Sequence, residues 1–166
     1  GNGPMAVASG AAVAPASATG ALVIDCGAFS LKAGLSTHSR PQAVLEAASS
    51  LCVGAGGLLA ADAGDAEPWR ELLERQLAVD VTQRPVLVGV PVATPRRVRE
   101  ELCQTLFESL GAPSLFIGSA AFLSVLGAGL STALVLDVGE AGAVAVPVDE
   151  GYPLVDSTAH GTVGGT

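Results

Sequence analysis

The stretch Ala21-Leu-Val-Ile-Asp25-Cys-Gly27 returns later in the chain as Ala133-Leu-Val-Leu-Asp137-Val-Gly139. In both copies a continuous apolar run, typical of a buried strand, ends in an Asp. A Gly two residues further on permits a tight turn into a second apolar run. The repeat therefore predicts two similar hairpins, each with a carboxylate at its mouth. Such a pair would form a pseudo-symmetric site for a phosphate–metal group; the alternative is two unrelated core strands that both end in Asp.

The composition indicates an acidic globular protein of one domain's length. The chain has 166 residues, of which 49% are hydrophobic and 14% charged, and its net charge is -8. A chain of this length buries about two thirds of its unfolded surface. Only 8 residues are Lys or Arg, so the clustered positive charge that neutralises nucleic-acid phosphates is missing. We therefore expect no nucleic-acid partner.

The cysteines and histidines follow no disulfide or metal pattern. Cys26, Cys52 and Cys103 are odd in number and lie at unrelated spacings, which favours reduced intracellular thiols. The two histidines, His38 and His160, are too few for a ligand cluster. No structural metal site is therefore predicted from these residues.

Both ends of the chain have the composition of flexible segments. Residues 1–20 are rich in Ala, Ser and Gly without the basic flank of a signal peptide, and residues 156–166 are rich in Gly and Thr. The uncharged run 115–136 has the length of a membrane span. Its small and hydroxyl residues near 127–132 instead divide it into a buried helix and a buried strand, so no membrane partner is expected.

Between the hairpins the sequence predicts helices and one further strand. Trp69 follows a Pro at the first turn of a helix and is its expected core anchor. Val86–Val90 has the pattern of a buried strand, and Thr94 is the expected N-cap of a helix that ends before Gly111. A small-residue helix from Ser119 leads into the second hairpin. The order hairpin, loop, helix, strand, helix, helix, hairpin predicts an α/β fold with a mixed sheet flanked by helices.

The segment before the first of these helices has no single interpretation. Residues 41–51 either extend the sheet or begin a short helix. The run 54–65 contains three clustered glycines but no following Lys-Ser/Thr, as a phosphate-binding P-loop requires. A surface loop is therefore predicted there.

With the hairpins and helices placed, the chain resembles the actin family. The first copy, Ile24-Asp-Cys-Gly-Ala-Phe-Ser-Leu-Lys32-Ala-Gly34, is similar to the family's first phosphate loop, including its Lys-Ala-Gly ending. The resemblance covers roughly residues 21–154, and the divergent mammalian actin-like paralogues are the most similar members. It implies the actin-like ATPase (ribonuclease-H-like) fold. Further matching motifs are Pro41-x-Ala43-Val44, Pro85-Val-Leu, Arg99-Glu100, Phe107-Glu108, Leu123-Ser124, Asp137-x-Gly139 and Glu150-Gly-Tyr152.

The resemblance implies a degenerate nucleotide site. In the family the two Asp-x-Gly turns hold the phosphates and the hydrated Mg²⁺ of ATP. The matching positions here are Asp25, Gly27, Lys32, Asp137 and Gly139. Backbone N–H groups at Gly turns bind phosphate oxygens, Lys supplies a positive charge, and carboxylates hold hydrated Mg²⁺. Asp25 and Asp137 would hold the metal through water, and only if Mg-ATP binds.

Departures from the family pattern argue against catalysis. The first loop reads Gly27-Ala28-Phe29 where the family has Gly-Ser-Gly, so a hydroxyl is lost and a ring stands where the backbone approaches phosphate. The second loop reads Val138-Gly139-Glu140-Ala141 and has lost another hydroxyl and another Gly. The family's water-positioning Gln and the neighbouring His match Ala120 and Val144, which cannot orient a water molecule. We expect a pseudo-ATPase with no catalytic residue and no required cofactor, Mg-ATP being the alternative.

The resemblance also indicates which parts of the family fold are present. Residues 21–132 match the first actin subdomain, with its small inserted subdomain replaced by a short loop near 45–68. Residues 133–155 match the opening hairpin of the second lobe, most of which has no counterpart here. We therefore do not expect filament assembly on the actin pattern.

A protein-binding surface is the better-preserved feature. In the family a hydrophobic cleft receives amphipathic helices of binding proteins, and its positions fall on Leu126, Gly127, Gly129, Glu150 and Tyr152. Small residues beside one exposed aromatic suit such docking, although they could equally be hinge and core. The leading hypothesis is a non-catalytic actin-like protein with protein partners in the cytoplasmic cytoskeleton or in a nuclear or perinuclear assembly. The alternatives are a residual Mg-ATP-binding ATPase and an actin-derived relic without a role.

Overall fold

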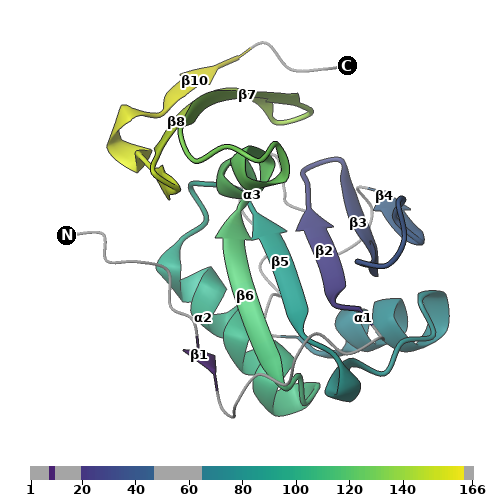
Figure 1. The fold of residues 1–166 in the computed structure, drawn as a ribbon. Helices are drawn as coiled ribbons and strands as arrows, with labels where there is room; N and C mark the ends of the chain where they lie inside the picture. Colours follow the sequence, from purple (N-terminus) through teal and green to yellow (C-terminus); the bar gives the residue numbers. More distant parts are fainter. Residues whose placement is uncertain (1–7, 10–19, 47–64, 163–166) are drawn as a thin grey trace.

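The computed structural model describes residues 8–9, 20–46 and 65–162. Two sheets lie one above the other, with helix α3 (Ala120–Gly127) between them (Figure 1). The large sheet has the strand order β1-β6-β5-β2-β3-β4, and the small sheet has the order β10-β8-β7, with β9 paired to β8. The large-sheet strands are β1 (Ala8–Ser9), β2 (Leu22–Cys26), β3 (Ser30–Leu35), β4 (Ala43–Glu46), β5 (Val86–Val90) and β6 (Ser114–Ser119). The small-sheet strands are β7 (Ala133–Gly139), β8 (Gly142–Asp149), β9 (Tyr152–Pro153) and β10 (Ala159–Gly161).

The predicted α/β class with a mixed sheet is confirmed. Strand β2 pairs antiparallel with β3 and parallel with β5, and β5 pairs parallel with β6. The second hairpin is also present, because β7 and β8 pair antiparallel down to Gly139 opposite Gly142. The two repeated Asp residues lie near the ends of β2 and β7, and both are close to α3.

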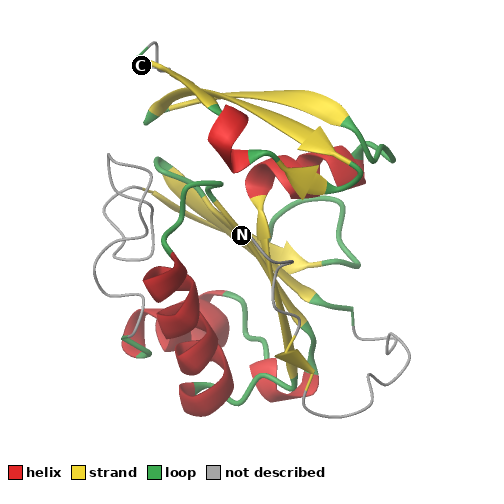
Figure 2. Ribbon diagram, turned by 90° about the vertical axis from the view of Figure 1, so that its left-hand side faces the viewer, coloured by secondary structure: helices red, strands yellow, loops and turns green. Residues whose placement is uncertain are grey.

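The main core lies between the large sheet and the helices on one of its faces (Figure 2). These helices are α1 (Glu67–Arg70), continued by a π-helical segment η1 (Glu71–Gln76), and α2 (Arg96–Gln104), continued by η3 (Thr105–Ser109). Trp69 is 0% exposed, which confirms it as a core anchor. The residues buried around it from both layers include Ile24, Leu31, Leu72, Val88, Leu102 and Leu106.

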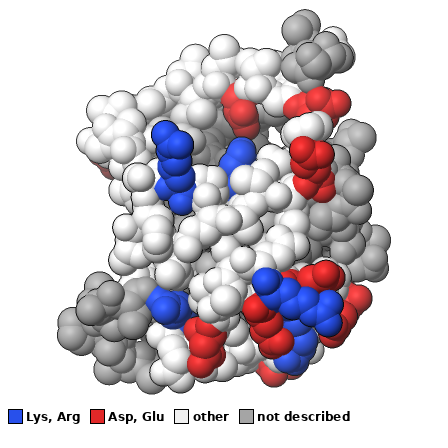
Figure 3. Space-filling model, turned by 90° about the vertical axis from the view of Figure 1, so that its right-hand side faces the viewer, with Lys and Arg blue, Asp and Glu red and all other residues white. Residues whose placement is uncertain are grey.

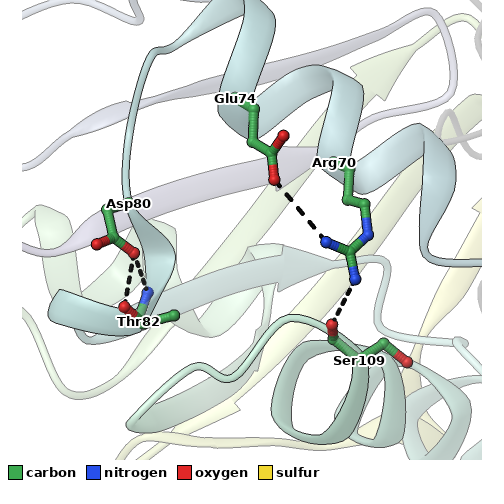
Figure 4. Close-up of polar contacts among 5 residues, drawn as sticks. All are labelled: Arg70, Glu74, Asp80, Thr82 and Ser109. Carbon is green, nitrogen blue, oxygen red and sulfur yellow. Dashed lines mark hydrogen bonds and ion pairs between the residues drawn. The ribbon is translucent and has the colours of Figure 1, made fainter.

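Polar contacts fix the ends of these helices (Figure 4). The guanidinium of Arg70 donates from Nη2 to the carbonyl oxygen of Ser109 at 2.8 Å, which ties α1 to the end of η3. Arg70 Nη1 also lies 3.8 Å from Glu74 Oε1. The side chain of Asp80 caps the 3₁₀ turn η2 (Val81–Gln83) by accepting from the backbone N and the Oγ1 of Thr82, at 3.0 and 2.6 Å. Gly111, with φ +73°, ends η3 as predicted.

Two local predictions were wrong. The first part of the run 115–136 is a strand, β6, which sequence analysis assigned to a helix, and only residues 120–127 are helical. A short apolar run without polar alternation has the same pattern in a buried strand as in a buried helix, and its parallel pairing with β5 decides the case. The N-cap of α2 is Pro95, and the hydroxyl of buried Thr94 instead donates to the Pro91 carbonyl oxygen at 2.7 Å.

The two ends contain pairing that composition did not indicate. Within residues 1–20, Ala8–Ser9 form β1 and pair antiparallel with β6. Within residues 156–166, β10 pairs antiparallel with β8 and follows the 3₁₀ turn η4 (Val155–Ser157), so the expected flexible end is wrong there. Such short edge strands carry too few residues for a periodic signal.

The segment between the first hairpin and α1 is described in part. Strand β4 pairs with β3, so residues 43–46 extend the sheet, and residues 47–51 lie outside the described residues. The loop predicted over 54–65 lies almost wholly outside them too. Among the described residues, no helix combines the length and the apolar character needed to cross a membrane.

Candidate functional site

The two repeated carboxylates lie in one cleft between the sheets. The cleft has a volume of about 760 Å³, and its lining includes Asp25 of β2 and Asp137 of β7. Asp25 is paired with Gly89 across the parallel strands β2 and β5. A Cβ placed on Gly89 would lie 3.5 Å from Asp25 Oδ1 and 3.2 Å from the Leu123 side chain. The absence of a side chain at Gly89 therefore leaves room for the carboxylate and for α3 above the sheet.

The carboxyl of Asp25 is electrostatically perturbed. Burial is the main cause that raises its pKa; the positive charge of Lys32 lowers it, and the negative charge of Asp137 raises it further. Lys32 Nζ lies 3.8 Å from Asp25 Oδ2, and both side chains are 51% exposed, so this pair contributes at most about 1 kcal/mol. The two carboxylates therefore carry like charge into the same cleft from different sheets.

Of the remaining residues of the predicted nucleotide site, Lys32 lies beside Asp25, whereas Gly27 and Gly139 belong to the two hairpin turns. The backbone N–H of Gly27 donates to the Ser30 carbonyl oxygen at 3.2 Å, so it is used within its own turn. A Cβ on Gly27 would lie only 2.7 Å from that oxygen, so the turn is too tight for any residue with a side chain. A Cβ on Gly139 would meet nothing within 4 Å. Gly27, Lys32 and Gly139 are absent from the residues that line the cleft.

The walls of the cleft are mostly apolar. The lining includes Ala120, at the start of α3, and Val144, in β8. These two side chains therefore line the same cleft as Asp25 and Asp137. The only described lining side chains with polar atoms are Asp25, Ser124, Asp137 and His160. Other members of the wall are Val23, Ile24, Leu87, Val92, Leu123 and Val146. A site of this kind offers few hydrogen-bond donors to a phosphate.

His160 is a lining residue that sequence analysis did not select. It lies opposite Val144 in the β10–β8 pairing, and Val144 in turn lies opposite Asp137 in the β8–β7 pairing. Directly opposed residues in an antiparallel sheet project from the same face. Asp137, Val144 and His160 therefore form one row on the face toward the cleft. No local signal marks His160, because only the pairing of β10 brings it there.

The carboxylates fit a hydrated Mg²⁺ better than they fit any directly bound metal. The described residues hold no group of three His, Cys, Asp or Glu side chains that would ligate a metal ion. Two carboxylates are the ligand set that holds Mg²⁺ through its waters and a phosphate. For the phosphate half of such a site, Lys32 beside Asp25 supplies a positive charge, but the N–H of Gly27 is already used by the Ser30 carbonyl oxygen.

The residues of the predicted partner surface come from two neighbouring segments. Leu126 and Gly127 end α3, and Gly129 follows with φ +72°. Glu150 lies in the turn between β8 and β9, and Tyr152 is the first residue of β9. Leu126 and Tyr152 are 58% and 61% exposed, and a Cβ on Gly127 or Gly129 would meet nothing within 4 Å. Leu126 and Gly127 also line the cleft.

Hydrogen bonds hold these two segments together. The backbone N–H of Gly151 donates to the Ser131 carbonyl oxygen at 2.7 Å. The Thr132 hydroxyl lies 3.2 Å from Asp149 Oδ1 and accepts from the backbone N–H of Glu150 at 3.0 Å. The partner surface is therefore built on a joined loop and turn rather than on separate parts of the chain.

Comparison with known proteins gives one family. The family model described as Actin matches residues 55–166. Actin-like protein 9 of Bos taurus is 37% identical over 98 residues, which is 59% of this chain and 24% of that protein. Actin-like protein 9 of Homo sapiens is 39% identical over 90 residues, covering 54% and 22%, and that of Mus musculus is 40% identical over 86 residues, covering 52% and 21%. The match thus spans about a quarter of the length of these relatives.

Proposed function

The chain belongs to the actin family, and on that premise we propose that it is a non-catalytic actin-like protein that binds other proteins. The observation that carries the proposal is the composition of the cleft between the sheets. Ala120 and Val144 share the space of Asp25 and Asp137, and neither side chain can donate or accept a hydrogen bond. Phosphoryl hydrolysis depends on an oriented water molecule, and Ala120 and Val144 stand at the two positions that the family resemblance assigns to orienting it.

The predicted phosphate loops support the same proposal. The turn at Gly27 uses its own N–H, and Phe29 beside it is 54% exposed. A phosphate group bound there would have to displace the Gly27–Ser30 hydrogen bond and approach past an aromatic ring. The protein would then act by binding other proteins through its surface, in the cytoskeleton or in a nuclear or perinuclear assembly.

A residual Mg-ATP site is the second candidate function. The observation that favours it is the placement of Asp25 and Asp137 in one cleft, since two carboxylates are suited to hydrated Mg²⁺. When bound, Mg²⁺ would neutralise the charge of the phosphates, and these two residues would hold its waters. This candidate predicts binding without efficient hydrolysis.

The melting temperature with and without millimolar Mg-ATP separates the two candidates. A ligand at about 100 times its dissociation constant adds about 2.7 kcal/mol to stability, which raises the melting temperature of a domain of this size by several degrees. We expect no shift in a cooperatively melting protein. A clear upward shift would support the nucleotide-binding candidate instead. ADP and magnesium alone serve as matched controls.

The protein-binding half of the proposal needs its own measurement. A labelled amphipathic helix of the kind that docks in the actin cleft is titrated with the full chain and with the Tyr152→Ala variant. Tyr152 is 61% exposed, so this change removes surface without opening the core. We expect the variant to bind at least several-fold more weakly. Equal binding by both proteins would count against this surface.

A further inference from the structure

The turn between β8 and β9 holds a charged residue in a backbone conformation that disfavours it. Asp149 is paired with Tyr152 across the two strands, so Glu150 and Gly151 form a two-residue turn. Their φ angles are +47° and +83°. Two-residue hairpin turns with positive φ at both positions favour Asn, Asp or Gly at the first of them. Glutamate costs stability there, because its Cβ crowds the backbone in the left-handed conformation.

The contacts that hold this turn do not use the Glu150 side chain. The backbone N–H of Glu150 donates to the Thr132 hydroxyl at 3.0 Å, and that of Gly151 donates to the Ser131 carbonyl oxygen at 2.7 Å. Glycine at position 150 would make the same backbone bond without strain. The fold itself therefore gives no reason for a glutamate here, and a strained residue without a structural role is the pattern expected of a functional residue.

The carboxylate of Glu150 is exposed, and the described residues give it no ion pair. From residue 100 to residue 166 the chain contains no Lys or Arg. Helix α3 ends beside this turn without a basic residue in its last turn, so the partial negative charge of its C-terminus adds to that of Glu150 and the neighbouring Asp149. The partner surface of Leu126 and Tyr152 thus has an apolar part and an acidic end.

Two glutamates of η1 show the contrasting, paired arrangement. Arg70 Nη1 lies 3.8 Å from Glu74 Oε1, and Arg75 Nη1 lies 3.9 Å from Glu71 Oε1. Figure 3 shows red and blue atoms side by side at the base of the molecule, where α1 and η1 lie. At Glu150 the chain itself supplies no such partner between residues 100 and 166. A positive charge from another protein would find this carboxylate unpaired.

We propose that Glu150 is the specificity-determining residue of the partner surface, and that it selects a protein whose docking helix carries Lys or Arg beside its apolar face. This inference rests on the proposed function, because it concerns the same surface of Leu126 and Tyr152. The apolar side chains supply contact area that amphipathic helices of many kinds can use. The carboxylate attracts a helix with a positive charge next to it and repels one with a negative charge there.

The test uses the full chain and two labelled amphipathic helices that differ only in one residue beside the apolar stripe, which is Lys in one and Glu in the other. Fluorescence anisotropy measures both affinities. We expect the natural chain to bind the Lys helix at least tenfold more tightly, and Glu150→Lys to reverse the preference. The matched control is Glu140→Lys, the same change of charge in the turn between β7 and β8, which should leave the preference unchanged. The preference should also shrink as salt rises.

The substitution Glu150→Gly tests the strained backbone separately. It removes the carboxylate and relieves the positive φ, so the melting temperature should rise by about 1–3 °C while the preference for the Lys helix is lost. Ala78→Gly is the matched control, because Ala78 has a φ of +51° and follows η1, away from the partner surface. It should raise the melting temperature similarly and leave both affinities unchanged. A less stable Glu150→Gly protein would give the side chain a structural role and overturn the proposal.

Failure of this inference and failure of the proposed function give different results. If the natural chain binds both helices equally and Tyr152→Ala weakens both, the partner surface stands and the role of Glu150 is overturned. If neither helix binds, or Tyr152→Ala changes neither affinity, the proposed function fails at this surface and the inference fails with it. A Glu150→Lys protein that is folded by circular dichroism and still prefers the Lys helix would also overturn the proposal.

Discussion

Asp25 and Asp137 lie in different sheets yet line the same cleft, and the negative charge of Asp137 contributes to the raised pKa of Asp25. Each stands in the same local pattern of an apolar strand followed by a Gly turn. The fold thus brings the two carboxylates of a short sequence repeat into one cleft. It also provides the most direct tests of the cleft.

Replacing Asp25 with Asn should stabilise the protein at neutral pH. The pKa of Asp25 is raised above 3.8 in the folded protein, so the folded state binds this proton more tightly than the unfolded state. Stability from this group is therefore lost as pH rises through the raised pKa. The side chain is about half exposed, so the expected gain at pH ~7 is at most about 1 kcal/mol. Urea denaturation measures it, and the gain should vanish below the unfolded pKa.

The matched control for this change is Lys32→Met. It removes the charge that lowers the pKa of Asp25, and should therefore destabilise the protein slightly at the same pH. An Asp25→Asn protein that is less stable than the natural chain at neutral pH would contradict the assignment.

The substitution Asp137→Asn should lower the pKa of Asp25. It removes the like charge across the cleft and leaves the burial of Asp25 and its pairing with Lys32 in place. Titration of the Asp25 side-chain carbon by NMR reports the change directly. Glu140→Gln is the control, because Glu140 does not contribute to the shift. An unchanged pKa in Asp137→Asn would mean that the carboxylates are too far apart to interact.

Restoring the first phosphate loop should not restore nucleotide binding. The double variant Ala28→Ser/Phe29→Gly returns the lost hydroxyl and removes the exposed ring. The N–H of Gly27 is still bonded to the Ser30 carbonyl oxygen, and the second loop still lacks its hydroxyl and its second Gly. We expect its melting temperature to stay unchanged by millimolar Mg-ATP. A rise of several degrees would show that these two loop positions alone had blocked the site.

Gly142→Ala should destabilise the small sheet. Gly142 has φ +121°, and an added Cβ would lie 2.7 Å from the carbonyl oxygen of Gly161 in β10. The strain and the clash together predict a loss of about 1–3 kcal/mol, seen as a lower melting temperature. Gly139→Ala, at the other side of the same turn, has nothing within 4 Å of its Cβ and should change stability by less than about 0.5 kcal/mol. Equal effects in both variants would contradict the pairing of β10 with β8.

Trp69→Ala should destabilise the main core strongly. The side chain is fully buried between α1 and the large sheet, and removing a buried aromatic ring costs about 3–5 kcal/mol. Because Trp69 is the only tryptophan, unfolding of the variant is followed by circular dichroism. Trp69→Phe keeps most of the buried surface and should lose much less. A loss below about 1 kcal/mol in Trp69→Ala would place the residue outside the core.

Local patterns in the sequence predicted the parts of the fold that are built from neighbouring residues. The hairpins of Asp25 and Asp137 and the burial of Trp69 all follow from runs of a few residues. Strand β6 was missed because an uninterrupted apolar run is compatible with a buried helix as well as a buried strand. The N-cap of α2 was predicted at Thr94 but is Pro95, because the Thr94 hydroxyl donates to the Pro91 carbonyl oxygen and does not cap the helix.

By itself the sequence determined the α/β class, both Asp-x-Gly turns and the resemblance to the actin family, because strand runs, glycine turns and motif order are properties of consecutive residues. Only the tertiary structure decided that His160 joins Asp137 and Val144 in one row, and that the N–H of Gly27 is bonded within its own turn. It also decided that Leu134 and Leu136 face solvent. Each of these depends on strand register and on which face α3 covers, and both are set by contacts between residues far apart in the chain.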